Sequence, residues 1–256
     1  MEYQLSITSA TGDDEEAIIP DGVSLIGANV FRGMDKLRRV VLPGSCTTID
    51  DNAFDSCRAL EEIVLPDSIT SIGSFAFKNC SSLVRIKLPA ALEGISKQMF
   101  ARCTALETVE GTHRIRTIAA DAFSGCSELR SFDARRATLI GERAFSGCRA
   151  LERVELGNEL QKIGHYAFRS CMSLHDITIP DGVVGLETNL FTGCPHITVH
   201  ASEEMVRKYP DAFPRALTLS YGIIRPQDVR DLSAQFRRNH ASDTVEFEQR
   251  RSELLA

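Results

Sequence analysis

The sequence predicts an α/β repeat solenoid, and three periodic features predict it. Seven of the eight cysteines recur at one interval, which is shortened once by a single position: Cys57, Cys80, Cys103, Cys126, Cys148, Cys171 and Cys194. Eight phenylalanines follow the same period, from Phe31 to Phe191, and between them the chain repeats L-x-x-I-x-L-P-x-x-I-x-x-I-G-x-x-A-F-x-x-C. A fixed period of this length indicates stacked coils, because a single coil cannot bury its own apolar face.

The first part of each repeat reads as a short strand. Ile63 and Leu65 alternate with Glu62 and Val64, which is the period-2 pattern of a strand with one buried face. Pro66 follows and ends the strand, because proline cannot donate to a hydrogen-bond ladder. Stacking these strands predicts one parallel sheet along the solenoid.

The second part of each repeat reads as a return to the next strand. Ile72 points back into the core, and Gly73 suits the sharp bend that follows it. Ala76 and Phe77 fit a short helical or 3-10 turn on the opposite side. Cys80 is small and apolar enough to lie inside. We therefore expect the repeated cysteines to be free, buried thiols.

The run IGSFAFKNCSSLVRIKLP resembles the BspA-like (Treponema-type) leucine-rich repeat, and the resemblance covers about Ala17 to Val199. It implies a curved right-handed solenoid of eight or so coils, each about 22–23 residues long, a length typical of leucine-rich repeats. The parallel sheet would lie on the concave face and short helical or 3-10 turns on the convex face. Members of this family are mostly surface-associated or secreted binding proteins of bacteria and some protists. They are not known as enzymes, and no family-wide ligand residues carry over.

The ends of the chain depart from the repeat. Tyr3, Leu5 and Ile7 alternate with polar residues, as in a strand, while Glu203–Tyr209 has a helical pattern and Ala216–Tyr221 a strand pattern. The sequence thus divides into an N-terminal cap (1–16), a solenoid (17–199), a C-terminal cap (200–222) and a helical tail (223–256). The tail either packs on the solenoid end or acts as a docking or oligomerisation segment.

Composition and charge limit the partners and the location. The net charge of −6 argues against a nucleic-acid-binding protein, and no apolar run reaches the ~18 residues that membrane insertion needs. The N-terminal residues have neither the basic start nor the apolar stretch of a secretory signal. We therefore expect a cytoplasmic location, with unpaired cysteines, or a secreted or cell-surface location if a signal was removed or bypassed.

The chain shows no motif for catalysis, a metal or a cofactor. A cysteine nucleophile needs an exposed thiolate beside a base, and zinc needs four ligands around a point, whereas a ladder places sulfurs in a line. Of the histidines, only His175 could approach His196 or His200 from a neighbouring coil, and we interpret all three as rim residues. The prediction is a protein that is not an enzyme and holds no metal or cofactor.

The outward positions of the strands are the candidate partner-binding residues. The charged ones are Arg39, Glu62, Arg85, Lys87, Glu110, Asp133, Arg153 and Glu155. A merely solvated sheet face is the alternative interpretation of the same residues. We predict a non-catalytic binding or scaffold module for a protein partner, acting as a monomer unless the tail mediates an oligomer. The alternative is a surface-associated or exported adhesin or effector that engages a host or extracellular ligand.

Overall fold

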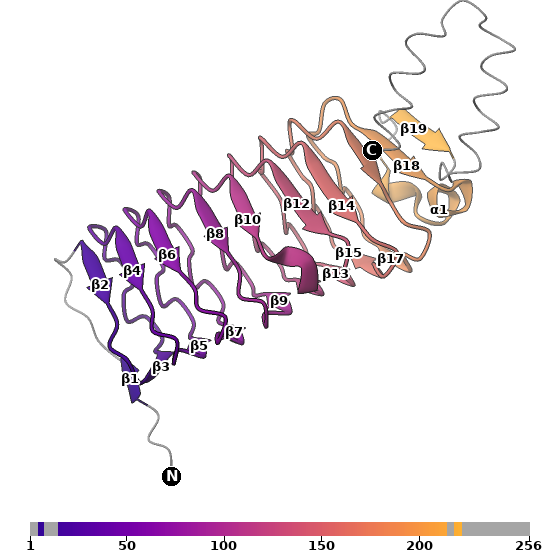
Figure 1. Ribbon diagram of the computed structural model, residues 1–256. Coiled ribbons are helices and arrows are strands. Elements are labelled where there is room, and N and C mark those ends of the chain that lie inside the picture. The colour runs from indigo at the N-terminus through magenta and orange to yellow at the C-terminus, as the bar shows by residue number, and fades with distance from the viewer. Residues whose placement is uncertain (1–4, 8–14, 214–217, 222–256) are drawn as a thin grey trace, which may run out of the picture. The chain divides into compact units, whose positions relative to one another are not determined.

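Parallel strands stack into a solenoid of about eight coils in the computed structural model of this chain (Figure 1). The structure describes residues 5–7, 15–213 and 218–221. The described residues all belong to one unit of the chain, Met1–Tyr221. The predicted solenoid is confirmed, and the helical tail predicted at 223–256 lies outside the described residues.

One side of the solenoid, here called the long-strand face, carries the predicted parallel strands. Its strands are β2 (Glu16–Ile18), β4 (Arg39–Val41), β6 (Glu62–Val64), β8 (Arg85–Lys87), β10 (Thr108–Glu110), β12 (Ser131–Ala134), β14 (Arg153–Leu156), β16 (Asp176–Thr178), β18 (Thr198–Ala201) and β19 (Thr218–Tyr221). They form four separate sheets (β2-β4-β6, β8-β10, β12-β14 and β16-β18-β19) where the sequence predicted one. Most of the strands bury the middle residue and expose its neighbours, as in β6 and β8. This confirms the alternation read from the sequence.

A second ladder, the short-strand face, was not predicted. It comprises β1 (Leu5–Ile7), β3 (Val23–Ile26), β5 (Thr48–Ile49), β7 (Ser71–Ile72), β9 (Gly94–Ile95), β11 (Thr117–Ile118), β13 (Leu139–Ile140), β15 (Lys162–Ile163) and β17 (Gly185–Leu186). Most of these strands have two residues, and all their pairings are parallel. The segment before each repeated glycine, read from the sequence as part of a bend, is therefore a strand.

The third side, the turn face, is built from short turns, as in the bond from the N–H of Cys57 to the carbonyl of Phe54 at 3.1 Å, where the sequence predicted short helical or 3-10 turns. Residues with a left-handed backbone recur in it, such as Phe75 (φ 62°) and Asn79 (φ 60°). The N–H groups of Asn52, Phe54 and Ser56 each donate to a carbonyl of the next coil at 2.7–2.9 Å. The helices of the described residues lie elsewhere, at η1 (Thr112–Arg114), α1 (Glu203–Lys208) and η2 (Pro210–Ala212).

The repeated glycine is needed for close approach between coils, and not for an unusual φ angle. A Cβ atom on Gly73 would lie 2.5 Å from the backbone nitrogen of Asp51 in the preceding coil. Gly164 meets the nitrogen of Glu142 at the same distance. Such contacts are too short for any side chain, so glycine holds these coils at their spacing.

A continuous column of stacked phenylalanine rings fills the core. Neighbouring rings from Phe31 to Phe191 lie 5.0–5.7 Å apart between centroids and within 11° of parallel. Phe132 replaces the usual aliphatic residue of its strand and packs against Phe123 and Phe145. All eight cysteines are free and buried, as predicted.

The ends of the solenoid extend its ladders. At the N-terminal end, β1 pairs with β3 and β2 pairs with β4. At the C-terminal end, Ser202 caps α1 by accepting a hydrogen bond from the N–H of Met205, and β19 pairs with β18. The helix and strand predicted at Glu203–Tyr209 and Ala216–Tyr221 are therefore present, with slightly shorter bounds.

Candidate interaction surface

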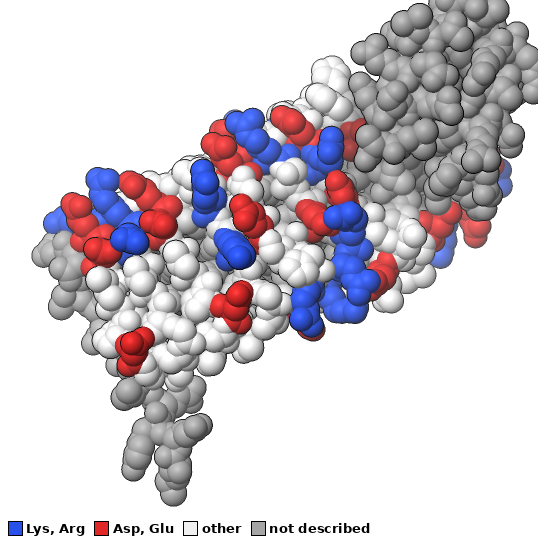
Figure 2. All heavy atoms as spheres, viewed as in Figure 1, with Lys and Arg blue, Asp and Glu red and all other residues white. Residues whose placement is uncertain are grey.

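The structure places all eight predicted binding residues on the long-strand face. Seven have exposed side chains, and Asp133 is half-buried. Figure 2 views this face and shows acidic and basic side chains interleaved over it. What the sequence could not show is which of these charges are neutralised within the chain, and this divides the eight residues into two sets.

The charges at the N-terminal end of the face are paired with one another across the strands. The pairs are Arg38 with Glu15 (3.7 Å) and Glu61 (3.0 Å), and Arg39 with Glu16 (3.1 Å) and Glu62 (3.4 Å). Each arginine thus bridges the acidic residues of the coils before and after it. Exposed pairs of this kind contribute ~0–1 kcal/mol each, but they leave Arg39 and Glu62 with little free charge to offer a partner.

A second paired group lies in the middle of the face, around an arginine that the sequence analysis missed. Arg135, in the loop after β12, contacts Asp133 at 2.7 Å and Glu155 at 3.3 Å. Hydrogen bonding to the Arg135 guanidinium lowers the pKa of Asp133 below its ordinary range. Arg135 lies only two residues after Asp133 in the sequence. The structure was needed to show that the loop turns its side chain back toward Asp133 and Glu155.

The other four predicted residues have no ion-pair partner within 4 Å among the described residues. These are Arg85, Lys87, Glu110 and Arg153, while every other predicted residue has at least one. Unneutralised exposed charges are the ones whose field reaches a partner in solution. They are the strongest candidates that the sequence analysis named.

Two of these charges border an interruption in the hydrogen bonding between coils. Consecutive strands β6 and β8 form no ladder, and neither do β7 and β9 on the short-strand face. The long-strand face is also interrupted between β10 and β12 and between β14 and β16, but there the short-strand ladder continues. Among the described residues, no backbone–backbone hydrogen bond joins 61–72 to 84–95, and we call this interruption the slit. The turn face of the same two coils stays bonded, for example from the N–H of Phe77 to the carbonyl of Met99 at 2.9 Å.

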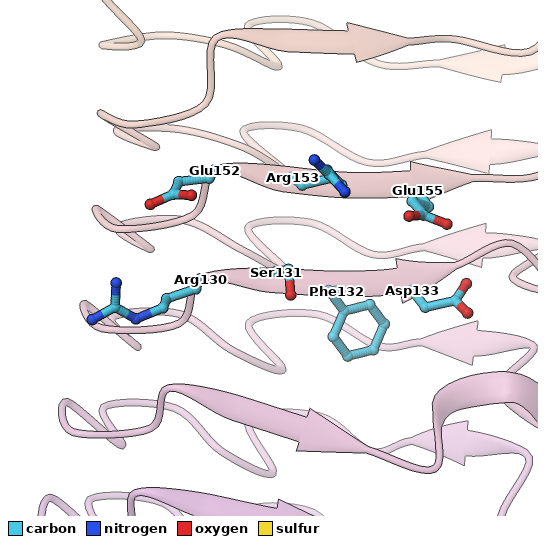
Figure 3. Close-up of a pocket in the computed structure, with 7 residues that line it drawn as sticks. All are labelled: Arg130, Ser131, Phe132, Asp133, Glu152, Arg153 and Glu155. Atoms are coloured by element: carbon cyan, nitrogen blue, oxygen red, sulfur yellow. The ribbon is translucent and has the colours of Figure 1, made fainter. Parts of the chain in front are cut away.

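The long-strand face is hollowed at the slit. The hollow has a volume of about 470 Å³, and its lining includes Glu62, Val64, Arg85, Lys87 and Glu110. A second hollow, of about 370 Å³, lies over β12 and β14 (Figure 3). In Figure 3, Asp133 and Glu155 lie side by side at the ends of their strands, and Arg153 stands on the same surface.

An apolar row runs beside the charged residues at the N-terminal end of the face. Ile18, Val41 and Val64 occupy the same position in β2, β4 and β6, and the strand register pairs each with the next. Ile18 is 70% exposed and Val64 is 56% exposed. Lys87 and Glu110 continue the row in β8 and β10. The face therefore changes along this row from aliphatic to basic to acidic.

We searched the described part of the long-strand face for a serine nucleophile and for metal ligands. Ser131, the hydroxyl in the hollow over β12 and β14, forms no hydrogen bond with a histidine or carboxylate among the described residues. A serine nucleophile needs such a base. Within the described ranges no three His, Cys, Asp or Glu residues gather as metal ligands. His200, one of the three histidines named from the sequence, contacts the carboxylate of Asp176 at 2.6 Å. None of the described helices is long and apolar enough to cross a membrane.

Comparison with known proteins gives a repeat family and solved relatives of the fold. The sequence profile of the BspA type leucine-rich repeat region matches residues 11–130 and 116–235. A crystal structure of a leucine-rich repeat protein of T. pallidum is 26% identical, with a TM-score of 0.61 over 84% of this chain and 91% of that one.

A second solved relative is a leucine-rich repeat protein of Eubacterium ventriosum. It is also 26% identical, with a TM-score of 0.50 over 74% of this chain and 46% of the relative. The comparison with curated proteins finds no match.

Proposed function

Because the chain belongs to the BspA-type leucine-rich repeat family, we propose that it is a non-catalytic module that binds a protein partner on its long-strand face. Proteins of this repeat family are typically interaction or surface proteins. One observation carries the assignment to this face: Arg85, Lys87, Glu110 and Arg153 are exposed there without ion-pair partners in the described part of the chain. Such charges steer a complementary partner and fix its register.

The rest of the molecule supports a rigid recognition platform. The core column and the hydrogen bonds between coils on the turn face, such as those from Phe54 to Ala76 and from Phe77 to Met99, hold the coils at fixed positions in the stack. Side chains on regular strands are held more precisely than side chains on loops, so the spacing of charges along the face is defined before a partner arrives. Binding then costs little ordering of the backbone.

We further propose that the protein works where thiols stay reduced. Seven cysteines direct their Sγ atoms at backbone carbonyls inside the core, as Cys80 does at Phe54. A disulfide between coils would remove these donors. Mass spectrometry of alkylated protein from its native source tests this proposal, which predicts eight free thiols and is contradicted by inter-coil disulfides.

The binding proposal is tested by capturing partners with the full chain and three variants. One reverses the unpaired basic residues (Arg85→Glu and Lys87→Glu), and another reverses Glu110→Lys and Arg153→Glu. The matched control, Lys97→Glu with Arg102→Glu, reverses two exposed basic residues elsewhere on the coils. A partner retained by wild type and control, and lost by either face variant, supports the proposal. A partner lost only by the control places binding on the other side of the coil and overturns it.

A further inference from the structure

Free backbone donors coincide with free charge at the slit. In the bonded coils, the N–H of Glu62 donates to the carbonyl of Arg38 at 3.1 Å, and the N–H of Thr108 donates to Val84 at 3.4 Å. The equivalent N–H of Arg85 would have to reach the carbonyl of Glu61, and no such bond is formed. The same strand therefore presents cationic side chains and an unused backbone donor to the hollow, two features that attract a carboxylate.

Two of the four acidic residues around the hollow are already neutralised by arginines. Glu61 and Glu62 are engaged by Arg38 and Arg39 at 3.0 and 3.4 Å. Asp67 accepts a hydrogen bond from the N–H of Ala90. Asp67 keeps its charge, because an amide N–H does not neutralise a carboxylate. Among the described residues that line the hollow, Arg85 and Lys87 are therefore the cations without an ion-pair partner, and Asp67 and Glu110 are the anions without one.

An aliphatic surface adjoins the basic residues on one side only. Val64 lines the hollow, and it continues through Val41 to Ile18 along the row described above. With a strand spacing of ~4.8 Å, the row from Ile18 to Glu110 is roughly 19 Å long, which matches about six residues of extended chain at ~3.3 Å each. In an extended segment, alternate side chains face the same way, so about three of them would meet this row.

We propose that the slit and its apolar row bind an extended segment of a partner protein, in which an aliphatic residue is followed two positions later by an acidic one. The acidic side chain lies over Arg85 and Lys87, and the aliphatic side chains rest on Val64 and Val41. This inference rests on the proposed function and narrows it to one partner chemistry. A polyanion such as nucleic acid fits less well, because Asp67 and Glu110, which have no ion-pair partner among the described residues, flank the two cations.

The test uses the full chain and a labelled, end-blocked octapeptide with the sequence Ser-Ile-Ser-Ile-Ser-Glu-Ser-Glu. Binding is measured by fluorescence anisotropy, and the site is located by ¹⁵N NMR shifts. We expect saturable binding, with shifts at Val64, Arg85 and Lys87. Replacing both glutamates of the peptide by lysine should weaken binding at least tenfold. Replacing both isoleucines by serine, which gives the serine–glutamate peptide, should weaken binding severalfold.

Two pairs of variants give matched controls. Arg85→Glu with Lys87→Glu should weaken peptide binding at least tenfold, whereas Lys97→Glu with Arg102→Glu should not change it. Val64→Ser should weaken it severalfold, whereas Val184→Ser, at a valine 69% exposed and outside the long-strand face, should not. Circular dichroism confirms that each variant is folded.

Three results overturn this inference: no saturable binding, equal binding of the serine–glutamate peptide, or binding that survives reversal of Arg85 and Lys87. The proposed function is judged separately by partner capture. If the face variants lose a captured partner while the peptide fails to bind, only the partner chemistry is wrong. If both face variants retain every captured partner, the proposed function itself is wrong.

Discussion

The Sγ atom of Cys103 donates a hydrogen bond to the carbonyl oxygen of Phe77, in the preceding coil, at 3.0 Å. The same relation recurs from Cys57 to Phe31 and at each later step to Cys194 and Phe168. It gives the repeated cysteine a physical reason beyond small size, because the thiol links the turns of successive coils. Met34 occupies this position in the first coil, where no phenylalanine of the column precedes it.

Replacing Cys103 should show how much this bond contributes. Cys103→Ala removes both the donor and the buried sulfur, and we expect a loss of ~1–2 kcal/mol in the free energy of unfolding. Cys103→Ser keeps a donor and should lie closer to wild type. Urea denaturation measures both. Equal stability of the two variants would mean that the hydrogen bond contributes nothing.

The thiols should be almost unreactive in the native protein. Burial raises the pKa of Cys57 to about 12, so its thiolate is scarce near pH 8. Ellman's reagent should titrate eight thiols after denaturation and few before it. Cys194, 8% exposed in the last coil of the ladder, should react first. Rapid native reaction of a mid-solenoid cysteine would contradict the observed burial.

The phenylalanine column should account for much of the stability. Phe123 is fully buried and stacks on Phe100 and Phe145 at 5.4 Å each. Phe123→Ala leaves a large cavity, and we expect a cost of ~3–5 kcal/mol in chemical denaturation. An exposed variant on the turn face, Arg102→Ala, should change stability by less than ~0.5 kcal/mol. A loss below ~1 kcal/mol for Phe123→Ala would be incompatible with a packed column.

The Arg135 cluster should depend on pH in a defined direction. Arg135 holds the pKa of Asp133 below its ordinary value of ~3.9, so the pair stabilises the fold above that pH and loses its effect as pH falls through the lowered pKa. Arg135→Gln should raise the pKa of Asp133 in an NMR titration of the carboxylate. An unchanged pKa would show that another group holds it.

Hydrogen exchange should locate the slit. The amides of Arg85 and Gly94 lack the inter-coil acceptors that Glu62 and Thr117 have in Arg38 and Glu93. We expect the first two to exchange faster than the second two in native-state measurements. Equal protection of all four would show that the ladders are continuous in solution.

The sequence predicted what repeats within one coil, and missed what depends on the relation between coils. The alternation around Ile63 and the Phe77 column follow from burial alone, so the period reveals them. The two-residue strands are too short for an alternation to be visible, and Phe75 takes a left-handed backbone that a bulky residue seldom adopts. Whether Arg85 is paired or free depends on side chains in the neighbouring coils, which the repeat pattern does not specify.

The hydrogen bonds of the turn face give the array a polarity. At the described junctions, the N–H of an earlier coil donates to a carbonyl of the later one, as from Phe54 to Ala76 and from Phe145 to Ala167. On the short-strand face, the bonds from Thr70 to Thr47 and from Gly73 to Ile49 run the opposite way, so each coil has a donor edge and an acceptor edge of defined position. Duplicating or deleting one whole unit preserves these directions and the bonding at every remaining junction. A lineage of such proteins can therefore change length by whole coils, whereas inverting a unit would break the array.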